Sequence, residues 1–261
     1  MSDQRARALE AGRNPFSSPL ALKHSNYCAP SGQALVRLLD FKPVSARSRF
    51  VHDALRAFLL SDDYPCVGAM SVLRRGGYRF GTYPKIGSEA ATHGLARDLC
   101  AFAMEVQPDE DAFASFIAVF DDVNSLDERA FEAALWSQLS SLRALDKRVF
   151  EYDPSVSSDP QSVRFAFSFA GTALFVVGLH PGSGRMSRRF AWPALVFNPH
   201  TQFRRLREAG RYSRFQQTVR KRDRNLQGTL NPNLSDFGHA SEARQYAGRA
   251  VEEDWKCPFR H

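Results

Sequence analysis

The segment VRFAFSFAGTALFVVGL, residues 163–179, constrains the fold of this chain more than any other. Two apolar runs that are rich in β-favouring residues stand on either side of Ala170 and Gly171, a pair that suits a tight turn. The pattern predicts a β-hairpin at the centre of a sheet.

Helices and further strands are predicted along the rest of the chain from the spacing of apolar residues. The predicted helices cover residues 45–61, capped by Ser45, residues 89–106, capped by Ser88, a segment that begins at Ser125 or Asp127, two basic segments near 201–208 and 212–225, and a last helix near 241–250. The predicted strands cover residues 78–83, 113–120 and 193–197. This mixture indicates an α+β fold, a mixed or antiparallel sheet packed with several helices, rather than a doubly wound one.

The length of 261 residues is enough to bury a large core. Residues 1–30 are polar and predicted to form an irregular N-terminal arm, and residues 31–261 are predicted to form a single catalytic domain. No run of about 18 uncharged apolar residues is present, which argues against a membrane span. The first residues, MSDQRARALEAGRNPF, contain no apolar signal core, so we expect a cytoplasmic protein.

The sequence lacks the motifs of several common protein classes. The four cysteines, Cys28, Cys66, Cys100 and Cys257, form no C-x-x-C pair, which argues against a zinc ribbon and a disulfide framework. The glycine-rich nucleotide motifs, the G-x-S-x-G elbow and the H-E-x-x-H zinc motif are also missing, which lowers the odds of a Rossmann dehydrogenase, a P-loop NTPase, a serine hydrolase or a zincin.

Positive charge is concentrated between Arg185 and Arg224. This block holds eleven Arg and one Lys against Glu208 and Asp223, a net charge of +10 in a chain whose total is +7. Such a block suggests an anionic partner or a solvated helix face. A nucleic-acid site is not expected, because apolar residues that look core-facing alternate with the arginines: Phe203, Leu206, Tyr212, Phe215 and Val219.

The loop LHPGSGRMSRRF, residues 179–190, is the densest motif of the chain. His180 follows the predicted strand directly, and a neutral imidazole at a strand end suits a metal or heme ligand. Arg185, Arg188 and Arg189 suit the carboxylates of a substrate or of heme propionates. The alternative is that His180 hydrogen-bonds the turn while the arginines hold helices in place.

Three other side chains are alternative ligands. Cys257 stands in WKCPF beside Lys256, which favours a thiolate, or it belongs to a tail docked by aromatic residues. Cys66 stands in YPCVGA, where it is either a thiolate ligand or a small buried residue. His200 stands in FNPHTQF, where it is a second imidazole or the cap of a basic helix. The first choice for a metal or heme ligand is His180, followed by Cys257, Cys66 and His200.

Six motifs make the sequence resemble the YqcI/YcgG family over roughly residues 45–260. They read YPCVGA, VVGLHPGSGR, FNPHTQF, QGTLNP, SEARQYAGR and WKCPF, in the order that the family pattern has them. Gly184 stands where that pattern usually has a second Ser.

Some members of this family look like heme-dependent N-oxygenases that hydroxylate guanidine groups in natural-product biosynthesis, including a D-cycloserine route. The resemblance implies heme b, O2 and an electron donor, either a reductase or a ferredoxin. It also implies L-arginine or a related guanidine as substrate, with Nω-hydroxy-L-arginine as product. A buried guanidinium needs a carboxylate partner, for which Asp236 and Glu242 are the first candidates and Asp159 is the reserve. The rival hypotheses are a heme-binding or heme-sensing protein without turnover and a nucleic-acid-binding protein that uses residues 185–224.

Overall fold

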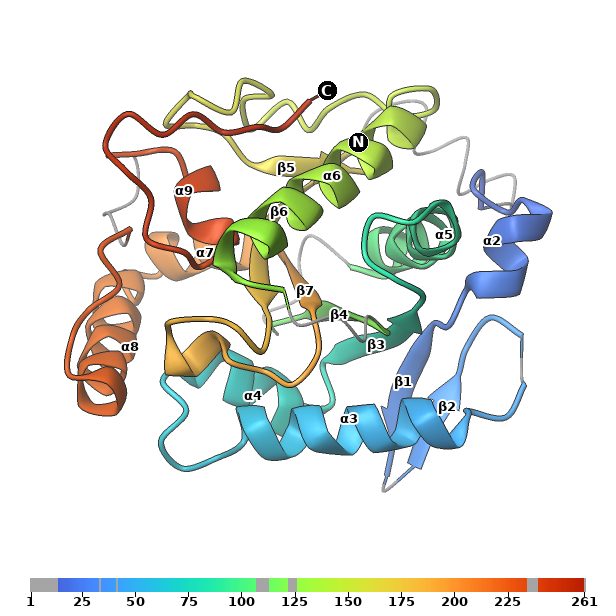
Figure 1. Ribbon diagram of the computed structural model, residues 1–261, viewed down its shortest axis with the longest axis horizontal. Helices are drawn as coiled ribbons and strands as arrows, with labels where there is room; N and C mark the ends of the chain where they lie inside the picture. Colours follow the sequence, from blue (N-terminus) through green and yellow to red (C-terminus); the bar gives the residue numbers. More distant parts are fainter. Residues whose placement is uncertain are drawn as a thin grey trace.

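One mixed sheet forms the centre of the computed structural model, which describes residues 14–260 except 33, 41, 107–112, 122–125 and 234–238. Across the sheet, the strands in these described ranges are β2 (Ala34–Arg37), β1 (Cys28–Ser31), β3 (Tyr78–Tyr83), β4 (Ser115–Phe120), β7 (Ala194–Pro199), β6 (Thr172–Leu179) and β5 (Phe167–Phe169) (Figure 1). β3 and β4 run parallel, and the other neighbouring strands run antiparallel.

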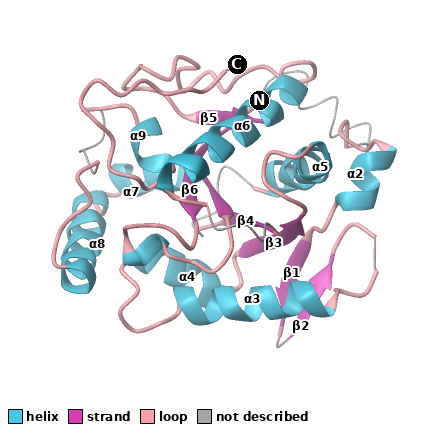
Figure 2. Ribbon diagram, viewed as in Figure 1, coloured by secondary structure: helices cyan, strands magenta, loops and turns pink. Residues whose placement is uncertain are grey.

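Helices cover both faces of this sheet (Figure 2). They are α2 (Pro19–His24), α3 (Ala46–Leu59), α4 (Val67–Arg75), α5 (Glu89–Glu105), α6 (Glu128–Asp146), α7 (His200–Glu208), α8 (Tyr212–Gln227) and α9 (Ala243–Tyr246), with a 3-10 turn at Met186–Arg188. α5 and α6 pack on one face, and α3 and α4 pack on the other. The predicted α+β class and a single domain are confirmed.

The central strand β4 shows why the sheet needs helices on both sides. Phe116 and Phe120 belong to the cluster under α5 and α6, whereas Ile117 and Val119 belong to the cluster under α3 and α4. All six residues of the strand are buried. A continuous apolar run of this length is typical of a strand that is covered on both faces.

Three predicted helix starts are confirmed by their capping hydrogen bonds. The Ser45 hydroxyl accepts from the Ser48 N–H at 3.0 Å, and the Ser88 hydroxyl accepts from the Ala91 N–H at 3.2 Å. The third helix begins after Asp127 rather than after Ser125, and the Asp127 carboxylate is its cap. These contacts satisfy N–H groups that the first turn of a helix leaves without partners.

The predicted hairpin is confirmed, but its predicted place at the centre of the sheet is wrong. β5 and β6 pair around Ala170 and Gly171, whose φ angles of 50° and 67° suit a tight two-residue turn. β5 is an edge strand, and β4 is central. The apolar residues of β5 are buried because side chains from the C-terminal segment cover them, with the Phe259 ring 6.0 Å from that of Phe167.

Two terminal segments differ from the sequence predictions. The described part of the predicted N-terminal arm is ordered: α2 packs beside α5, and β1 pairs with both β2 and β3. The last helix is shorter than predicted and covers only Ala243–Tyr246, since Gly248 takes a φ of 82°, outside the helical region. Within the described ranges, no helix has the length and apolar character needed to cross a membrane.

Candidate functional site

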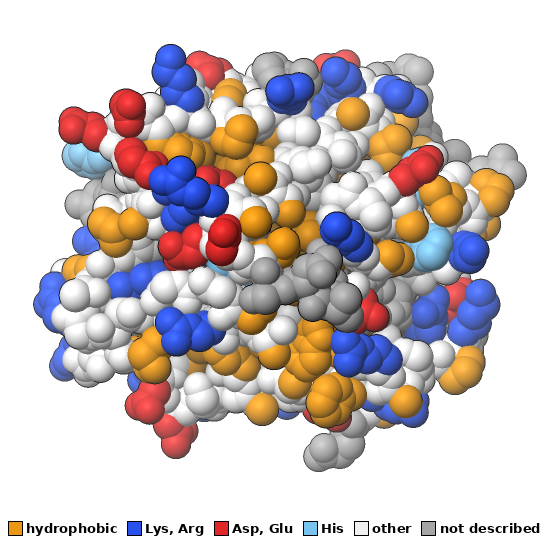
Figure 3. Space-filling view, viewed as in Figure 1, with side chains coloured by type: hydrophobic (Ala, Val, Ile, Leu, Met, Phe, Trp, Pro, Cys, Tyr) orange, Lys and Arg blue, Asp and Glu red, His pale blue; other side chains and the backbone are white. Residues whose placement is uncertain are grey.

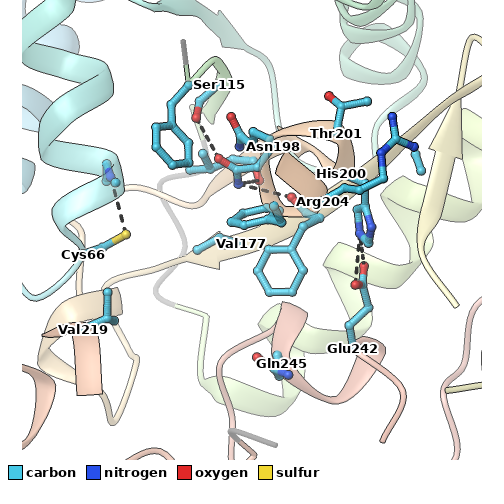
Figure 4. A pocket seen from close by; sticks show the side chains of 18 of the residues that line it. Cys66, Ser115, Val177, Asn198, His200, Thr201, Arg204, Val219, Glu242 and Gln245 are labelled. Carbon is cyan, nitrogen blue, oxygen red and sulfur yellow. Dashed lines mark hydrogen bonds and ion pairs between the residues drawn. The ribbon is translucent and has the colours of Figure 1, made fainter. Parts of the chain in front are cut away.

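A cavity of about 1110 Å³ lies against the face of the sheet that α3 and α4 cover only in part (Figure 4). α4, α7 and α8 enclose it, and β6 and β7 form its floor. The floor and walls are largely apolar, with side chains that include Phe175, Val177, Leu179, Val196, Phe203 and Phe215. This volume and lining suit an organic ligand or cofactor with a few polar contacts.

Cys66 stands on the α4 side of the cavity, as the N-cap of that helix. Its Sγ accepts a hydrogen bond from the Ala69 N–H at 3.4 Å. Burial raises the pKa of the thiol, while the backbone N–H groups of Ala69 and Gly68 and the charge of Arg188 act in the opposite direction. Burial outweighs these opposing effects, so Cys66 is a buried thiol at a helix N-terminus that lines the cavity.

His200 and Glu242 form a pair on the opposite side of the cavity (Figure 4). β7 ends at Pro199, so His200 is the first residue of α7. Its Nε2 lies 3.0 Å from the Glu242 carboxylate, which also accepts a hydrogen bond of 2.5 Å from the Tyr246 hydroxyl. Burial raises the pKa of Tyr246 well above its usual value, so the phenol remains a hydrogen-bond donor.

The floor of the cavity also carries neutral polar groups. The Ser115 hydroxyl at the start of β4 donates to the Asn198 side-chain carbonyl at 2.7 Å. The Asn198 amide in turn donates to the Phe175 carbonyl at 3.2 Å. These two residues and Asp153, whose carboxylate accepts from the Ala173 N–H at 2.8 Å, were missed by the sequence predictions. The signal for Ser115 and Asn198 was a polar residue at the end of an apolar strand, and Asp153 stands in the segment between α6 and β5 without such a signal.

The three predicted arginines have different surroundings. Arg185 lines the cavity and forms an ion pair of 2.5 Å with Asp223 of α8. Arg188 also lines the cavity and donates to three backbone carbonyl groups. Arg189 is exposed, does not line the cavity, and donates to the Ser183 carbonyl at 2.9 Å.

His180 lies on the other face of the sheet and does not line the cavity. Side chains alternate along β6, so Leu179 faces the cavity and His180 faces α6. The imidazole stacks on the Phe131 ring with 4.2 Å between centroids and has no accessible surface. Burial lowers the pKa of His180, so the ring is neutral. A group bound in the cavity therefore cannot take His180 as its ligand, contrary to the first choice from the sequence.

The remaining predicted residues lie elsewhere. Cys257 is buried in the core beneath α6, where burial raises the pKa of its thiol to about 12. Asp159 is exposed and accepts from the Gln161 N–H at 2.9 Å. Asp236 lies outside the described residues. Of the three candidate carboxylates, Glu242 is the one that the described structure brings to the cavity.

The basic helices α7 and α8 form a cavity wall on their inner side. Of the apolar residues that were predicted to face a core, Phe203, Tyr212, Phe215 and Val219 line the cavity, and Leu206 does not. Arg204, Arg207 and Arg220 of these helices also line the cavity. Other basic side chains lie at the edge of the molecule that carries α8 (Figure 3). The prediction that these residues face a packed core is therefore wrong, since none of the five is fully buried and four of them face a cavity.

Metal-ion sites built from several side chains are missing from the described ranges, which hold no group of three or more His, Cys, Asp and Glu residues in reach of one ion. A heme iron is different, because one axial side chain is enough to hold it. Cys66 and His200 are the cysteine and the histidine that line the cavity, and both residue types hold heme iron in known proteins.

Comparison with known proteins gives one family and one relative. The model of the YqcI/YcgG family matches residues 55–260. An uncharacterized protein YcgG from Bacillus subtilis (strain 168) is 25% identical over 209 residues, which cover 76% of this chain and 81% of that protein. No solved structure gives a significant match.

Proposed function

Because the chain belongs to the YqcI/YcgG family, we propose that it is a heme-dependent N-oxygenase that converts L-arginine to Nω-hydroxy-L-arginine for D-cycloserine-type natural-product biosynthesis. The observation that carries the proposal is the large apolar cavity with a thiol on one side and an imidazole–carboxylate pair on the other. An apolar cavity of this size suits a porphyrin, which is flat and apolar except for its propionates.

The residues present fit heme b. Cys66 would hold the iron, because its sulfur lines the cavity and accepts a hydrogen bond from the Ala69 N–H, whereas His200 Nε2 is already paired with Glu242. Bound heme, with O2 and an electron donor such as a reductase or ferredoxin, supplies an oxidant strong enough for a guanidine nitrogen, a poor nucleophile. One oxygen atom enters an N–H bond of the substrate, and the other leaves as water with two electrons and two protons from the donor side.

Glu242 is proposed to hold the guanidinium of the substrate. Among the described residues no Arg or Lys pairs with it, whereas the cavity carboxylate of Asp223 is already neutralised by Arg185. A guanidinium placed against Glu242 gains the charge-assisted hydrogen bonds that a carboxylate offers. Tyr246 positions the carboxylate, and the apolar walls keep water away from the reacting nitrogen.

An absorption spectrum of the purified protein tests heme binding. We expect a Soret band, and a reduced CO complex with the long-wavelength position of a thiolate ligand, which Cys66→Ala removes. The matched control is Cys257→Ala, a cysteine outside the cavity, which leaves the spectrum unchanged. An imidazole-type CO spectrum that is lost in His200→Ala makes His200 the ligand. Protein that retains no hemin contradicts the proposed function.

Turnover tests the substrate. Glu242→Gln removes the charge but keeps the shape, so we expect hemin binding to persist while kcat/KM for L-arginine falls about a hundredfold, equivalent to about 3 kcal/mol. Glu151→Gln, an exposed carboxylate at the rim of the cavity, is the control. Heme-loaded protein that forms no hydroxyarginine with O2 and a competent reductant excludes arginine as the substrate. Heme binding without any turnover favours a sensing role.

A further inference from the structure

The geometry of Arg188 points to a receptor for a carboxylate: we propose that this residue binds the carboxylate of a largely apolar or extended ligand inside the large cavity. The proposal deepens the proposed function, on which the identity of that ligand rests. Its physical basis is a guanidinium that is held rigidly by neutral groups and turned toward the cavity.

Three of the five N–H groups of Arg188 have backbone partners. Nη1 donates to the carbonyl oxygens of Gly178 at 3.1 Å and Tyr246 at 3.2 Å, and Nη2 donates to that of Gln245 at 3.2 Å. The remaining two N–H groups, on Nε and Nη2, make no hydrogen bond to the described residues. Nε and Nη2 form the side edge of the guanidinium, and this edge binds a carboxylate through two parallel hydrogen bonds.

The charge of Arg188 is a second observation that favours an anion at this point. Arg188 forms no ion pair with any carboxylate in the described ranges. Asp223 is near enough to influence it, but that carboxylate is bonded to Arg185 at 2.5 Å. Burial lowers the pKa of Arg188, as expected for a cation whose hydrogen-bond partners are all neutral. A charge in such surroundings is stabilised strongly by an opposite charge that arrives with a ligand.

The fold fixes the position of this guanidinium through two distant segments. Arg188 follows the turn after β6, and its partners Gln245 and Tyr246 belong to α9. Gly248 packs against its side chain: a Cβ atom at that position would lie 3.4 Å from Arg188 Cγ. Arg188 therefore joins the motif VVGLHPGSGR, through Gly178, to the motif SEARQYAGR, through Gln245 and Tyr246. These contacts give the second motif a function in binding.

The other two arginines of the loop do not qualify. Arg185 has a carboxylate partner and two further bonds to Thr229, so its charge is already balanced. Arg189 is exposed and does not line the cavity. Arg189 is therefore a matched control, since it is an arginine of the same turn whose guanidinium faces away from the cavity.

Decanoate and decanol are the probes for the receptor, because they share an apolar chain and differ in the carboxylate. By isothermal titration calorimetry at pH 7, the wild-type protein is expected to bind decanoate at least tenfold more tightly than decanol. Arg188→Met is expected to abolish this preference. Arg188→Lys is expected to retain part of it, because lysine keeps the positive charge but cannot donate two parallel hydrogen bonds to a carboxylate. Arg189→Met is expected to leave the preference unchanged. Circular dichroism and thermal melting confirm that each variant is folded.

Two results would overturn the receptor. One is a wild-type protein that binds decanoate no better than decanol, a result that does not depend on whether Arg188→Met folds. The other is a folded Arg188→Met or Arg188→Lys protein that keeps the full preference of the wild type.

Two further titrations identify the natural source of the carboxylate. A porphyrin propionate is the source if hemin binds at least tenfold more tightly than hemin dimethyl ester and Arg188→Met removes that difference. The α-carboxylate of the substrate is the source if Arg188→Met weakens the binding of L-arginine but does not weaken the binding of agmatine, which lacks that carboxylate. A protein that prefers decanoate through Arg188 but binds neither hemin nor arginine retains the receptor and contradicts the proposed function.

Discussion

The large cavity and a second, smaller pocket differ in how their polar groups are satisfied. The second pocket, of about 480 Å³, lies at the carboxyl ends of β3 and β4 and shares no lining residue with the large cavity. Its polar side chains bond mainly to one another: the Ser48 hydroxyl lies 2.7 Å from that of Thr82, to which the Asn26 amide donates at 2.5 Å. Its two arginines also pair with nearby carboxylates, Arg37 with Asp40 and Arg47 with Asp121.

The large cavity leaves polar groups available. Arg188 keeps two N–H groups without described partners, and Glu242 accepts from His200 and Tyr246 but has no Arg or Lys partner in the described ranges. A half-buried charge that no opposite charge of the protein neutralises is a group with which a ligand of opposite charge can pair. The comparison teaches that a polar lining alone does not mark a binding site, whereas charged groups without a charged partner do.

Removal of Asp98 is the strongest test of the small pocket as a structural region. Its carboxylate is buried behind the pocket and accepts from the Ser25 hydroxyl, the Asn26 N–H at 2.6 Å and the Tyr83 hydroxyl at 2.7 Å. Asp98→Ala leaves three buried donors without an acceptor, so we expect the free energy of unfolding to fall by roughly 3 kcal/mol or more in urea titrations. Decanoate binding in the large cavity should not change.

Asp121→Ala is the control for that experiment. Asp121 lines the same pocket, but its pair with Arg47 is exposed and should contribute less than about 1 kcal/mol. If the two variants lost equal amounts of stability, the buried hydrogen bonds of Asp98 would contribute no more than the exposed ion pair of Asp121, which would contradict this distinction.

The pH dependence of stability sharpens the same contrast. Burial raises the pKa of Asp98 to about 6, and burial raises that of Asp146 to about 6 as well. The pKa values of these two carboxyl groups are higher in the folded protein than in the unfolded chain. The stability that the two protonated groups contribute is therefore complete at pH below about 4 and is lost as pH rises through 6. Two pKa units correspond to about 3 kcal/mol for each group.

Asp98→Asn removes the ionisation at one of these two sites. In urea titrations between pH 4 and pH 7, the loss of stability with rising pH should therefore be smaller in Asp98→Asn than in the wild type, by about 3 kcal/mol. Identical pH profiles for the two proteins would show that Asp98 does not titrate in this range.

A pair of glycine substitutions gives the smallest expected effects. A Cβ atom at Gly94 of α5 would lie 2.5 Å from the His24 carbonyl oxygen beside the small pocket, so Gly94→Ala must displace α2 and should cost about 2 kcal/mol. A Cβ atom at Gly68 of α4 would meet the Phe215 ring at 3.2 Å, and that ring faces the large cavity. Gly68→Ala should therefore cost less than about 1 kcal/mol. A larger loss of stability for Gly68→Ala in thermal melts would show that the Phe215 ring cannot move into the large cavity.

Local sequence signals predicted most of the elements. Ser45, Ser88 and Asp127 were recognisable as helix caps because capping depends on a side chain and the backbone three residues away. The hairpin at Ala170 and Gly171 was predictable for the same reason. Its position at the edge of the sheet was not, because strand order depends on contacts between segments that are far apart in the chain.

The candidate site was predicted in part. Cys66, His200, Glu242, Arg185 and Arg188 all line the large cavity. His180 does not, although it belongs to the same motif, because a shift of one residue along β6 moves a side chain to the opposite face of the sheet. The alternation along a strand is visible in the sequence, but which face carries the cavity is not.

The caps, the turn, the apolar strands and the set of polar residues from which a site could be built were all visible in the order of residues, since each of these depends on neighbours within a few positions. Which of those polar residues meet depends on how the elements pack in three dimensions. Packing of α7 and α8 against the sheet brings His200 to Glu242, and the contact between the loop after β6 and α9 turns Arg188 toward the cavity. Those contacts join residues more than 40 positions apart, over which no local pattern extends.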